Sequence, residues 1–504
     1  MTVQVRHYIG GQWVAGSTGE TMKTFNPATG EPVAEVAVAG PAEVRAAAAA
    51  AARAFPAWRR VPAPKRGEIL YRLAEILRER KEELAQLLTR EMGKVIVEAR
   101  GDVQEAIDMA YYMAGEGRRL SGQVVVPSEL PDKWAMAVRE PIGVVAAITA
   151  FNFPIAVPSW KILPALVLGN TVVWKPSPDT SATAAAFVRC FEEAGVPAGV
   201  INLLVGGGPE VGAALVEDPD VKMVSFTGST QVGREVYAAA ARHLKRVALE
   251  LGGKNAITVL ADADLDLATE AILWAAFGTT GQRCTACSRV IVEEPIYDEL
   301  VRRLVPRAQA LKIGDGLDPT VQVGPLVSER ALRRVEAYVA EARAAGIEIL
   351  CGGERADLGR GYFYKPTILG RVPPESKFAQ EEIFGPVLSL IVVRDLEEAI
   401  RVNNGVAYGL SSAIFTRDVN KAFRAMRELD TGIVYVNHGT TGAEIQLPFG
   451  GTKATGNGMR EAGLAALDTF SEWKSIYVDY SGRLQRAQID TDALARLPEQ
   501  WLPE

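Results

Sequence analysis

The spacing of apolar positions changes along the chain, and each change predicts a different set of elements. Residues 8–38 read as short strands joined by turns, with FNPATGEPV as the clearest turn signal. The alanine-rich residues 41–58 predict a helix, and apolar positions at i, i+3 and i+4 predict further long helices over residues 65–117. Alternation over residues 121–143 then predicts a β-hairpin.

Strands and helices alternate from residue 143 onward. GVVAAITA and NTVVWKPS contain continuous apolar runs, as expected of parallel strands that are covered on both faces. VINLLVGG, VKMVSFTGS, RVALELGG and AITVL follow, and a second series after residue 262 contains SRVIVEE, PTIL, VLSLIVV, SSAIFT and GIVYVN. This order predicts a doubly wound α/β fold. The strand-like segment SIYVDYSGRLQ precedes a mostly polar tail, and no internal repeat is evident.

Length and composition narrow the class of protein. The 504 residues exceed one ordinary core, so we expect two or three domains. The net charge of −6, without any basic run, argues against nucleic acid as a partner. The 4 cysteines are too few for a disulfide scaffold, and the N-terminal MTVQVRHYIGGQW lacks the apolar core of a signal peptide. We therefore expect the cytoplasm as the location.

The most apolar stretch, residues 142–160, carries no charge and is long enough to cross a bilayer. Asn152, Pro154 and Pro158 interrupt it, however, and Lys161 follows directly after it. Such interruptions favour a buried strand, loop and helix over a membrane span. We expect no membrane association.

Two of the cysteines lie in the glycine-rich segment GTTGQRCTACSRV, residues 278–290. Cys284 could be a nucleophile, because glycine lets a backbone approach a ligand and the neighbouring Arg283 could lower the thiol pKa. It could equally be a small buried residue, as free cysteines usually are. A redox pair with Cys287 would need a thioredoxin-like context that the sequence lacks, and a zinc site would need a second Cys/His pair nearby. We expect no metal.

The chain has only 3 histidines, so a carboxylate is a candidate for the base that serves the thiol. Glu250 ends an apolar strand, where desolvation raises the pKa of a carboxyl toward neutrality. Asn152 stands at another strand end, where α/β sheets place their ligands, and its amide could donate to an oxyanion. Taken singly, Glu250 could be an ion-paired strand end and Asn152 a turn residue.

Two further segments suit a nucleotide. Lys175 lies at the next strand end and could meet a phosphate or a ribose, or could simply be solvated. SFTGSTQVG, residues 225–233, predicts a strand, a turn and a helix start, whose free N–H groups bind pyrophosphate well. Because it is not the GxGxxG pattern, it does not identify a nucleotide site by itself.

Together these segments resemble the aldehyde dehydrogenase superfamily over about residues 8–478. FNFP, VVWKPS, FTGSTQVG, LELGGKNA, GQRC, EEIFGPV and PFGGTKATGNGMRE occur in the family order, and the interval from Glu250 to Cys284 also fits. The resemblance implies an aldehyde dehydrogenase-like α/β fold in three parts, which form a homo-oligomer, either a dimer or a tetramer. They are a Rossmann-like NAD(P)-binding domain (1–122 and 144–255), an α/β catalytic domain (256–470) and a β oligomerisation flap (123–143 and 471–504).

The resemblance also implies roles for single residues. Cys284 would be the nucleophile, Asn152 and the Cys284 N–H would hold the oxyanion, and Glu250 would activate water. An aldehyde would be oxidised to the acid through a thiohemiacetal and a thioester on Cys284. The cofactor would be NAD or NADP, bound by Phe151, Lys175, Ser177, Gly228, Ser229, Gly233, Glu382 and Phe384.

Two positions bear on the choice of cofactor and substrate. NAD-preferring members of the family often carry a glutamate three positions after the lysine, where this chain has Pro178, so we expect NADP to be accepted alongside NAD. An arginine before the nucleophile, here Arg283, occurs in branches that accept carboxylate-bearing semialdehydes such as 2-oxoglutarate semialdehyde, although it occurs in other branches too. A broad-specificity aliphatic aldehyde dehydrogenase is the alternative.

The tail at residues 481–504 extends past the family core. It could be an arm that lies on a neighbouring subunit, with Trp501 and Leu502 as apolar anchors, or it could be a frayed terminus. The resemblance further suggests that the strand before the tail pairs with the 121–143 hairpin across a subunit interface.

Two other classes of function are open. A CoA-acylating dehydrogenase needs no base that activates water, so Glu250 argues against it. A non-catalytic protein on the same scaffold is also conceivable, because fold does not fix function. The joint presence of Cys284, Glu250 and Asn152 argues against that reading.

Overall fold

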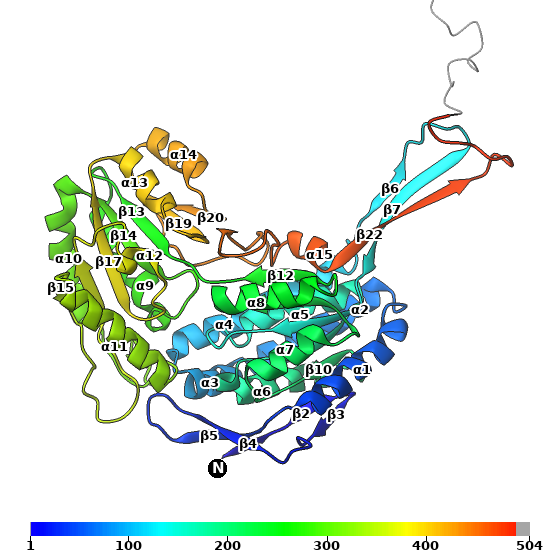
Figure 1. Cartoon of the computed structure of the whole chain (residues 1–504), viewed down its shortest axis with the longest axis horizontal. Helices are drawn as coiled ribbons and strands as arrows, with labels where there is room; N and C mark the ends of the chain where they lie inside the picture. The colour runs from blue at the N-terminus through cyan, green and yellow to red at the C-terminus, as the bar shows by residue number, and fades with distance from the viewer. Residues whose placement is uncertain (1, 490–504) are drawn as a thin grey trace, which may run out of the picture.

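The computed structural model describes residues 2–489, in which two seven-stranded sheets lie side by side and a three-stranded flap projects from one of them (Figure 1). The order of the first sheet is β12-β11-β8-β9-β10-β2-β3, and its first five strands are parallel. In that order the strands are β12 (Arg246–Glu250), β11 (Val221–Thr227), β8 (Val144–Ile148), β9 (Thr171–Lys175), β10 (Ile201–Leu203), β2 (His7–Ile9) and β3 (Gln12–Val14).

Helices cover both faces of the first sheet because its strands are apolar on both sides. Val145 and Trp174 pack into a core with one group of helices, while Ala146 and Val173 pack into a second core with another group. The first group is α2 (Ala63–Glu79), α3 (Lys81–Met92), α4 (Ile96–Glu116), α5 (Ala156–Leu168) and α6 (Ser181–Glu193). The second group is α1 (Pro41–Trp58), α7 (Pro209–Glu217) and α8 (Thr230–Ala241).

The second sheet is parallel except at its edge strand β15, and it has the order β15-β16-β17-β14-β13-β19-β20. Its strands are β15 (Glu348–Cys351), β16 (Thr367–Gly370), β17 (Val387–Val393), β14 (Cys287–Glu293), β13 (Asn255–Val259), β19 (Ser411–Phe415) and β20 (Ile433–Val436). Its helices are α9 (Leu265–Phe277), α10 (Tyr297–Gln309), α11 (Glu329–Ala344), α12 (Lys377–Gln380), α13 (Leu396–Asn404) and α14 (Val419–Glu428). The doubly wound α/β prediction is confirmed.

Small elements complete the chain. An N-terminal sheet has the order β1-β5-β4, and a two-stranded sheet joins β18 to β21. Their bounds, with those of the short helices, are β1 (Val3–Val5), β4 (Thr21–Phe25), β5 (Pro32–Ala37), β18 (Tyr408–Gly409), β21 (Thr452–Lys453), α15 (Ala465–Thr469), η1 (Pro178–Thr180), η2 (Gly278–Gly281) and η3 (Glu294–Ile296). Within residues 2–489, no helix combines the length and the hydrophobicity that crossing a membrane requires.

The flap pairs β22 (Ser471–Asp479) with β7 (Lys133–Pro141), which also pairs with β6 (Gln123–Val126). The hairpin prediction for residues 121–143 is confirmed, but pairing of the last strand across a subunit interface is wrong, since β22 and β7 belong to one chain. The reason is local: the buried amide of Asn170 donates to Phe470 O at 2.9 Å and accepts from Gly143 N at 3.0 Å. One side chain therefore holds the end of the β7 segment and the start of β22 close together within the same chain.

Candidate active site

A cavity of about 360 Å³ lies where the ends of the first sheet face the second. Cys284 and Glu250 both line it, the first from the loop before β14 and the second from the end of β12. Apolar side chains supply one part of the remaining wall: Val97, Phe153, Val157, Trp160, Leu251, Trp274, Ala443 and Phe449. Charged side chains supply another part: Glu98, Asp102, Glu105, Arg283 and Glu461. The cavity thus joins a thiol and a carboxyl between apolar and charged side chains.

Cys284 is partly exposed to this cavity and forms no disulfide. Its carbonyl accepts the Asn255 amide at 2.7 Å, and the same amide donates to Ala286 O at 2.9 Å. A Cβ at Gly253 would lie 2.6 Å from the Cys284 carbonyl oxygen, so this close approach of two loops requires glycine. Burial, and then the charges of Glu250 and Glu382, raise the pKa of the thiol to about 12. A base must therefore take the proton at neutral pH.

Glu250 is buried, and its carboxyl makes no hydrogen bond to any other residue of the described chain. Burial, followed by the negative charge of Glu461, raises its pKa well above the ordinary value. A Cβ at Gly450 would lie 2.8 Å from Glu250 Oε1, so the glycine leaves room for the carboxyl. A free carboxyl with a raised pKa has the properties of a general base near neutral pH.

Glu461 and Lys161 form a buried ion pair beside Glu250, and sequence reasoning assigned no role to either residue. Lys161 also donates to Ser225 Oγ at 3.1 Å. The available signals were weak: Lys161 is the charge that ends the long apolar stretch, and Glu461 is the last residue of the segment PFGGTKATGNGMRE. Neither signal indicates that the two side chains meet next to the base.

Asn152 follows β8, in the bend before α5. The residue is buried, and its side-chain amide makes no hydrogen bond within the described residues. The next residue, Phe153, lines the cavity. The amide is therefore available to an oxygen atom of a bound molecule.

The order of the first sheet reverses between β8 and β11, and such a switch point is where doubly wound sheets bind nucleotides. Lys175 ends β9 at this edge and is buried; among residues 2–489 its ammonium donates only to Pro176 O, at 3.4 Å. Burial lowers the pKa of Lys175 to about 8. Ser177 caps η1 by accepting the Asp179 N–H at 3.4 Å. An amine with one weak partner fits the hydroxyl groups of a ribose.

The turn after β11 fits a pyrophosphate. Ser229 caps the twelve-residue helix α8, accepting the Val232 N–H at 3.4 Å. A Cβ at Gly228 would lie 2.5 Å from the Phe226 ring, so the chain passes tightly there. Gly233 has a different reason to be glycine, because a Cβ there would lie 2.4 Å from Leu251. Gly233 thus lets α8 approach Leu251, which directly follows β12.

Three more predicted residues lie close to one another or to the loop of Cys284. Phe151 and Phe384 meet edge to face, with ring centroids 5.8 Å apart. Glu382 accepts the Gly253 N–H at 3.0 Å, and burial raises the pKa of its carboxyl. Glu382 and Phe384 also line a small hollow together with Gly253 and Arg283, beside the loop that carries Cys284.

Arg283 lines the cavity but is already bound on one side. Its Nη2 lies 2.7 Å from Glu98 Oε1, and its Nε donates to Thr279 Oγ1 at 2.9 Å. Its Nη1 makes no hydrogen bond within the described residues. Cys287, by contrast, is buried at the start of β14, with its thiol toward Arg289 O. Among residues 2–489 no group of three potential metal ligands gathers.

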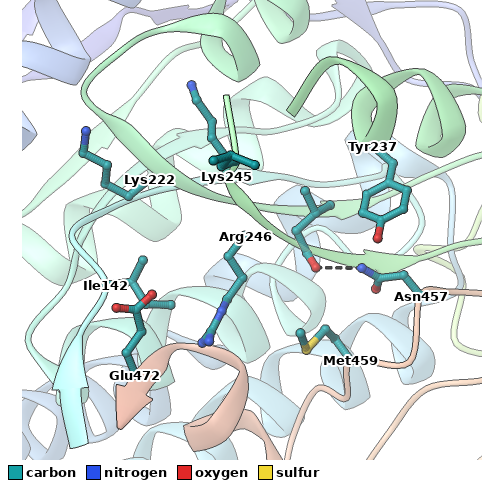
Figure 2. A pocket seen from close by; sticks show the side chains of 10 residues that line it. Ile142, Lys222, Tyr237, Lys245, Arg246, Asn457, Met459 and Glu472 are labelled. Atoms are coloured by element: carbon teal, nitrogen blue, oxygen red, sulfur yellow. Dashed lines mark hydrogen bonds between the residues drawn. The ribbon is translucent and has the colours of Figure 1, made fainter. Parts of the chain in front are cut away.

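A second hollow lies next to the base of the flap, and three cationic side chains line it (Figure 2). Its lining residues include no thiol. Lys222 and Lys245 donate to backbone carbonyls of residues 216–219, and Arg246 donates to the carbonyl of Ser471, the first residue of β22. Figure 2 shows these three side chains spread around the hollow rather than converging on it. We therefore do not assign a ligand to this hollow.

Comparisons with known proteins agree with this geometry. The sequence profile of the aldehyde dehydrogenase family matches residues 13–476. An alpha-ketoglutaric semialdehyde dehydrogenase of Bacillus subtilis is 43% identical over 476 residues, which cover 94% of this chain and 97% of the relative. An NADP(+) succinate-semialdehyde dehydrogenase of Escherichia coli is 40% identical, covering 93% and 97%.

Solved structures are equally similar. A crystal structure of a putative aldehyde dehydrogenase from Burkholderia cenocepacia has a TM-score of 0.93 at 38% identity and covers 96% of this chain and 99% of its own. Betaine aldehyde dehydrogenase from Staphylococcus aureus in complex with NAD+ has a TM-score of 0.93 at 35% identity and covers 96% of both chains. The chain belongs to the aldehyde dehydrogenase family, and it is an oxidoreductase that uses NAD or NADP.

Proposed function

We propose that the chain oxidises an aldehyde that carries a distal carboxylate, such as 2-oxoglutarate semialdehyde, to the corresponding acid. The observation that carries this proposal is that Arg283 and Cys284 line one cavity, in which Arg283 is the one cation among the lining residues. Nη1 of Arg283 makes no hydrogen bond within the described residues, so it has a donor left for a carboxylate, and the apolar part of the wall fits the carbon chain between the two ends of the substrate. The names of the semialdehyde dehydrogenase relatives support the same class of substrate.

In the proposed acylation, Glu250 takes the thiol proton and Cys284 Sγ bonds to the aldehyde carbon. The Asn152 amide and the Cys284 N–H donate to the alkoxide that results, and each such donor contributes on the order of 3 kcal/mol to the barrier reduction. NAD or NADP, when bound, would supply the acceptor for the hydride that the substrate carbon loses as the thioester forms. Lys175, the α8 N-terminus and Glu382 would hold the cofactor.

In the proposed deacylation, Glu250 first returns its proton to solvent. It then takes a proton from water, the water oxygen attacks the thioester carbon, and the acid leaves as Cys284 regains a thiolate. The apolar walls limit how much water reaches the intermediate. This second use of Glu250 distinguishes hydrolysis from transfer to CoA, so we expect the acid to form without added CoA.

The test of the substrate class is kcat/KM for 2-oxoglutarate semialdehyde against hexanal. We expect the semialdehyde to be preferred by roughly a hundredfold, about 2.7 kcal/mol of transition-state discrimination. The runner-up, a broad aliphatic aldehyde dehydrogenase, is favoured by the ion pair that already binds Arg283 to Glu98. Hexanal turnover equal to or faster than that of the semialdehyde would support the runner-up and contradict our proposal.

We also propose that NADP is accepted alongside NAD. Pro178 opens η1, so no carboxylate at that position repels a 2′-phosphate. Asp179 is the nearest acidic residue in sequence, and burial raises the pKa of its carboxyl, which favours its neutral form. We expect less than a hundredfold difference in kcat/KM between the cofactors, and P178E should shift the ratio toward NAD. A larger preference of the unmodified chain for NAD would contradict this.

The proposal also assigns a role to each domain, an oligomeric state and a cellular location. We assign residues 1–122 and 144–255 to NAD(P) binding, residues 256–470 to catalysis, and the flap to assembly of a homo-oligomer. The two sheets and the exposed rings of Trp473 and Tyr477 support this assignment. All four cysteines are unpaired, which suits the reducing cytoplasm. The suggested arm with Trp501 and Leu502 lies outside the described residues.

A further inference from the structure

Two consecutive threonines before Cys284 have a left-handed backbone. Thr279 has φ = 49° and Thr280 has φ = 57°, within the short turn η2. β-Branched residues rarely adopt this conformation, and two in succession persist only where the surroundings hold them. The chain reaches Cys284 five residues after Thr279, so the direction of this turn sets where the thiol lies.

Glu98, in the first turn of α4, holds this turn from outside. Its carboxylate accepts the Thr279 N–H at 2.9 and 2.8 Å and the Thr279 hydroxyl at 2.9 Å. It also accepts Arg283 Nη2 at 2.7 Å, and Arg283 Nε donates back to Thr279 Oγ1 at 2.9 Å. The three side chains therefore form a closed ring of hydrogen bonds that spans the turn and the residue before Cys284.

The ring of hydrogen-bonded side chains is buried and closely packed. Glu98, Thr279 and Arg283 are 7%, 3% and 9% exposed. A Cβ at Gly278 would lie 2.8 Å from Glu98 Oε1 and 3.1 Å from Arg283 Nη2, so the ring has little room to shift. Thr280 is fixed separately, because its hydroxyl donates to Gly324 O at 2.9 Å. Buried charge-assisted hydrogen bonds of this kind fix geometry strongly.

We propose that Glu98 is a positioning residue, which holds the Gly278–Gly281 turn so that Cys284 faces the cavity and Arg283 stays at the cavity wall. This inference rests on the proposed role of Cys284 as the nucleophile. Glu98 belongs to α4 and also lines the cavity, but within the described residues its carboxylate bonds only Thr279 and Arg283 and makes no hydrogen bond or ion pair to Cys284 or to a cofactor residue named above. Its proposed effect on the thiol therefore passes through Thr279 and Arg283.

The test compares E98Q with the unmodified chain. Glutamine keeps the shape and can still accept the Thr279 N–H, but it loses the charge that binds Arg283. We expect kcat for hexanal to fall about tenfold with little change in KM, because misplacing a reacting group affects the chemical step more than binding. Hexanal is chosen because it has no carboxylate for Arg283 to bind. E98A should lose more than E98Q.

Alkylation of Cys284 by iodoacetamide, followed by mass spectrometry, gives a readout that does not need turnover. Removing a negative charge near a thiol lowers its pKa and, by electrostatics alone, speeds alkylation. Displacement of the turn slows it, and we expect E98Q to react about three- to tenfold more slowly. Alkylation at or above the unmodified rate, together with unchanged kcat, would overturn the proposal whatever the thermal stability.

E116Q is the matched control. Glu116 is a buried carboxylate on the same helix and is likewise paired with an arginine, Arg119, at 2.6 Å, but it does not touch the Cys284 loop. We expect E116Q to alkylate and turn over within about twofold of the unmodified chain. A loss equal to that of E98Q would show that α4 stability, not the turn, is responsible. If the unmodified chain oxidised no aldehyde, the proposed function would fail, while alkylation would still test Glu98.

Discussion

The two carboxyls nearest the chemistry, Glu250 and Glu461, differ in what surrounds them. Glu461 is bound to Lys161 in a fully buried ion pair, whereas the Glu250 carboxyl has no hydrogen-bond partner in the described chain. The charge of Glu461 raises the pKa of Glu250, while Lys161 lowers it. Burial is the largest cause of the raised pKa of Glu250, and this pair of residues, which do not themselves react, adjusts that pKa further.

E461Q should move the acidic limb of the pH profile. Loss of the Glu461 charge removes a cause that raises the pKa of Glu250 and leaves Lys161 unopposed, so both changes lower that pKa. The carboxylate form of Glu250 then persists to lower pH. We expect the acidic limb of kcat/KM to shift to lower pH, measured between pH 5 and 9.

E250Q provides the control for that profile. It has no carboxyl to titrate, so it should lose the acidic limb and at least about a hundredfold in kcat, as expected when a general base is removed. An unchanged limb in E461Q, with kcat otherwise intact, would show that Glu461 does not tune the base.

Among the elements, the flap is held to the body by the side chain of Asn170, which directly precedes β9. The residue is fully buried, and its side chain bonds Gly143 N, Ala165 O and Phe470 O. One amide thus connects the strand after the hairpin, the end of α5 and the residue before β22. Arg246 adds a second link by donating to the carbonyl of Ser471, the first residue of β22.

N170A should loosen this junction. Leaving buried groups unsatisfied costs about 3 kcal/mol in total, and the unfolding entropy of a chain this long is on the order of 1 kcal/mol per degree. We therefore expect a decrease in Tm of about 3 °C by calorimetry. N420A, at an exposed asparagine on α14, should stay within about 1 °C, and equal decreases in the two variants would contradict the role of Asn170.

The elements also show what the sequence could predict. The alanine-rich helix was predicted to the residue, at Pro41–Trp58, because composition and turn signals mark both ends. The strand before the tail begins at Ser471, earlier than the segment SIYVDYSGRLQ indicated, because β22 is mostly exposed and lacks an apolar signal there. Its partner in the sheet could not be read from periodicity, since pairing over so many residues leaves no local trace.

In the candidate site, too, some residues could be identified from the sequence and others could not. Cys284, Glu250 and Asn152 stand in segments with a glycine or strand-end pattern, so their chemistry could be proposed from the sequence alone. Glu98 and Glu461 could not, because each is an ordinary glutamate until the fold brings it to Thr279 or to Glu250.

At the scale of the whole molecule, the flap exposes large aromatic side chains to solvent. It projects from the body in Figure 1, and Trp473 and Tyr477 are 51% and 66% exposed on one face of β22. Arg139 and Lys133 lie over these two rings, which leaves the other side of each ring to solvent. Large exposed aromatic side chains on a sheet usually mark a contact with another protein.

The double variant W473E/Y477E should separate the subunits of the proposed homo-oligomer. Two carboxylates on this face would be desolvated if another subunit covered it, so we expect the mass from light scattering to fall to that of a smaller assembly or a single chain. K474Q, on the opposite face of the same strand, is the control and should keep the mass of the unmodified chain. An unmodified chain that already runs as a monomer, or a double variant of unchanged mass, would show that this face of the flap does not hold subunits together. Since Cys284, Glu250 and the cavity all lie in the body, the dissociated variant should keep measurable turnover, which separates assembly from catalysis.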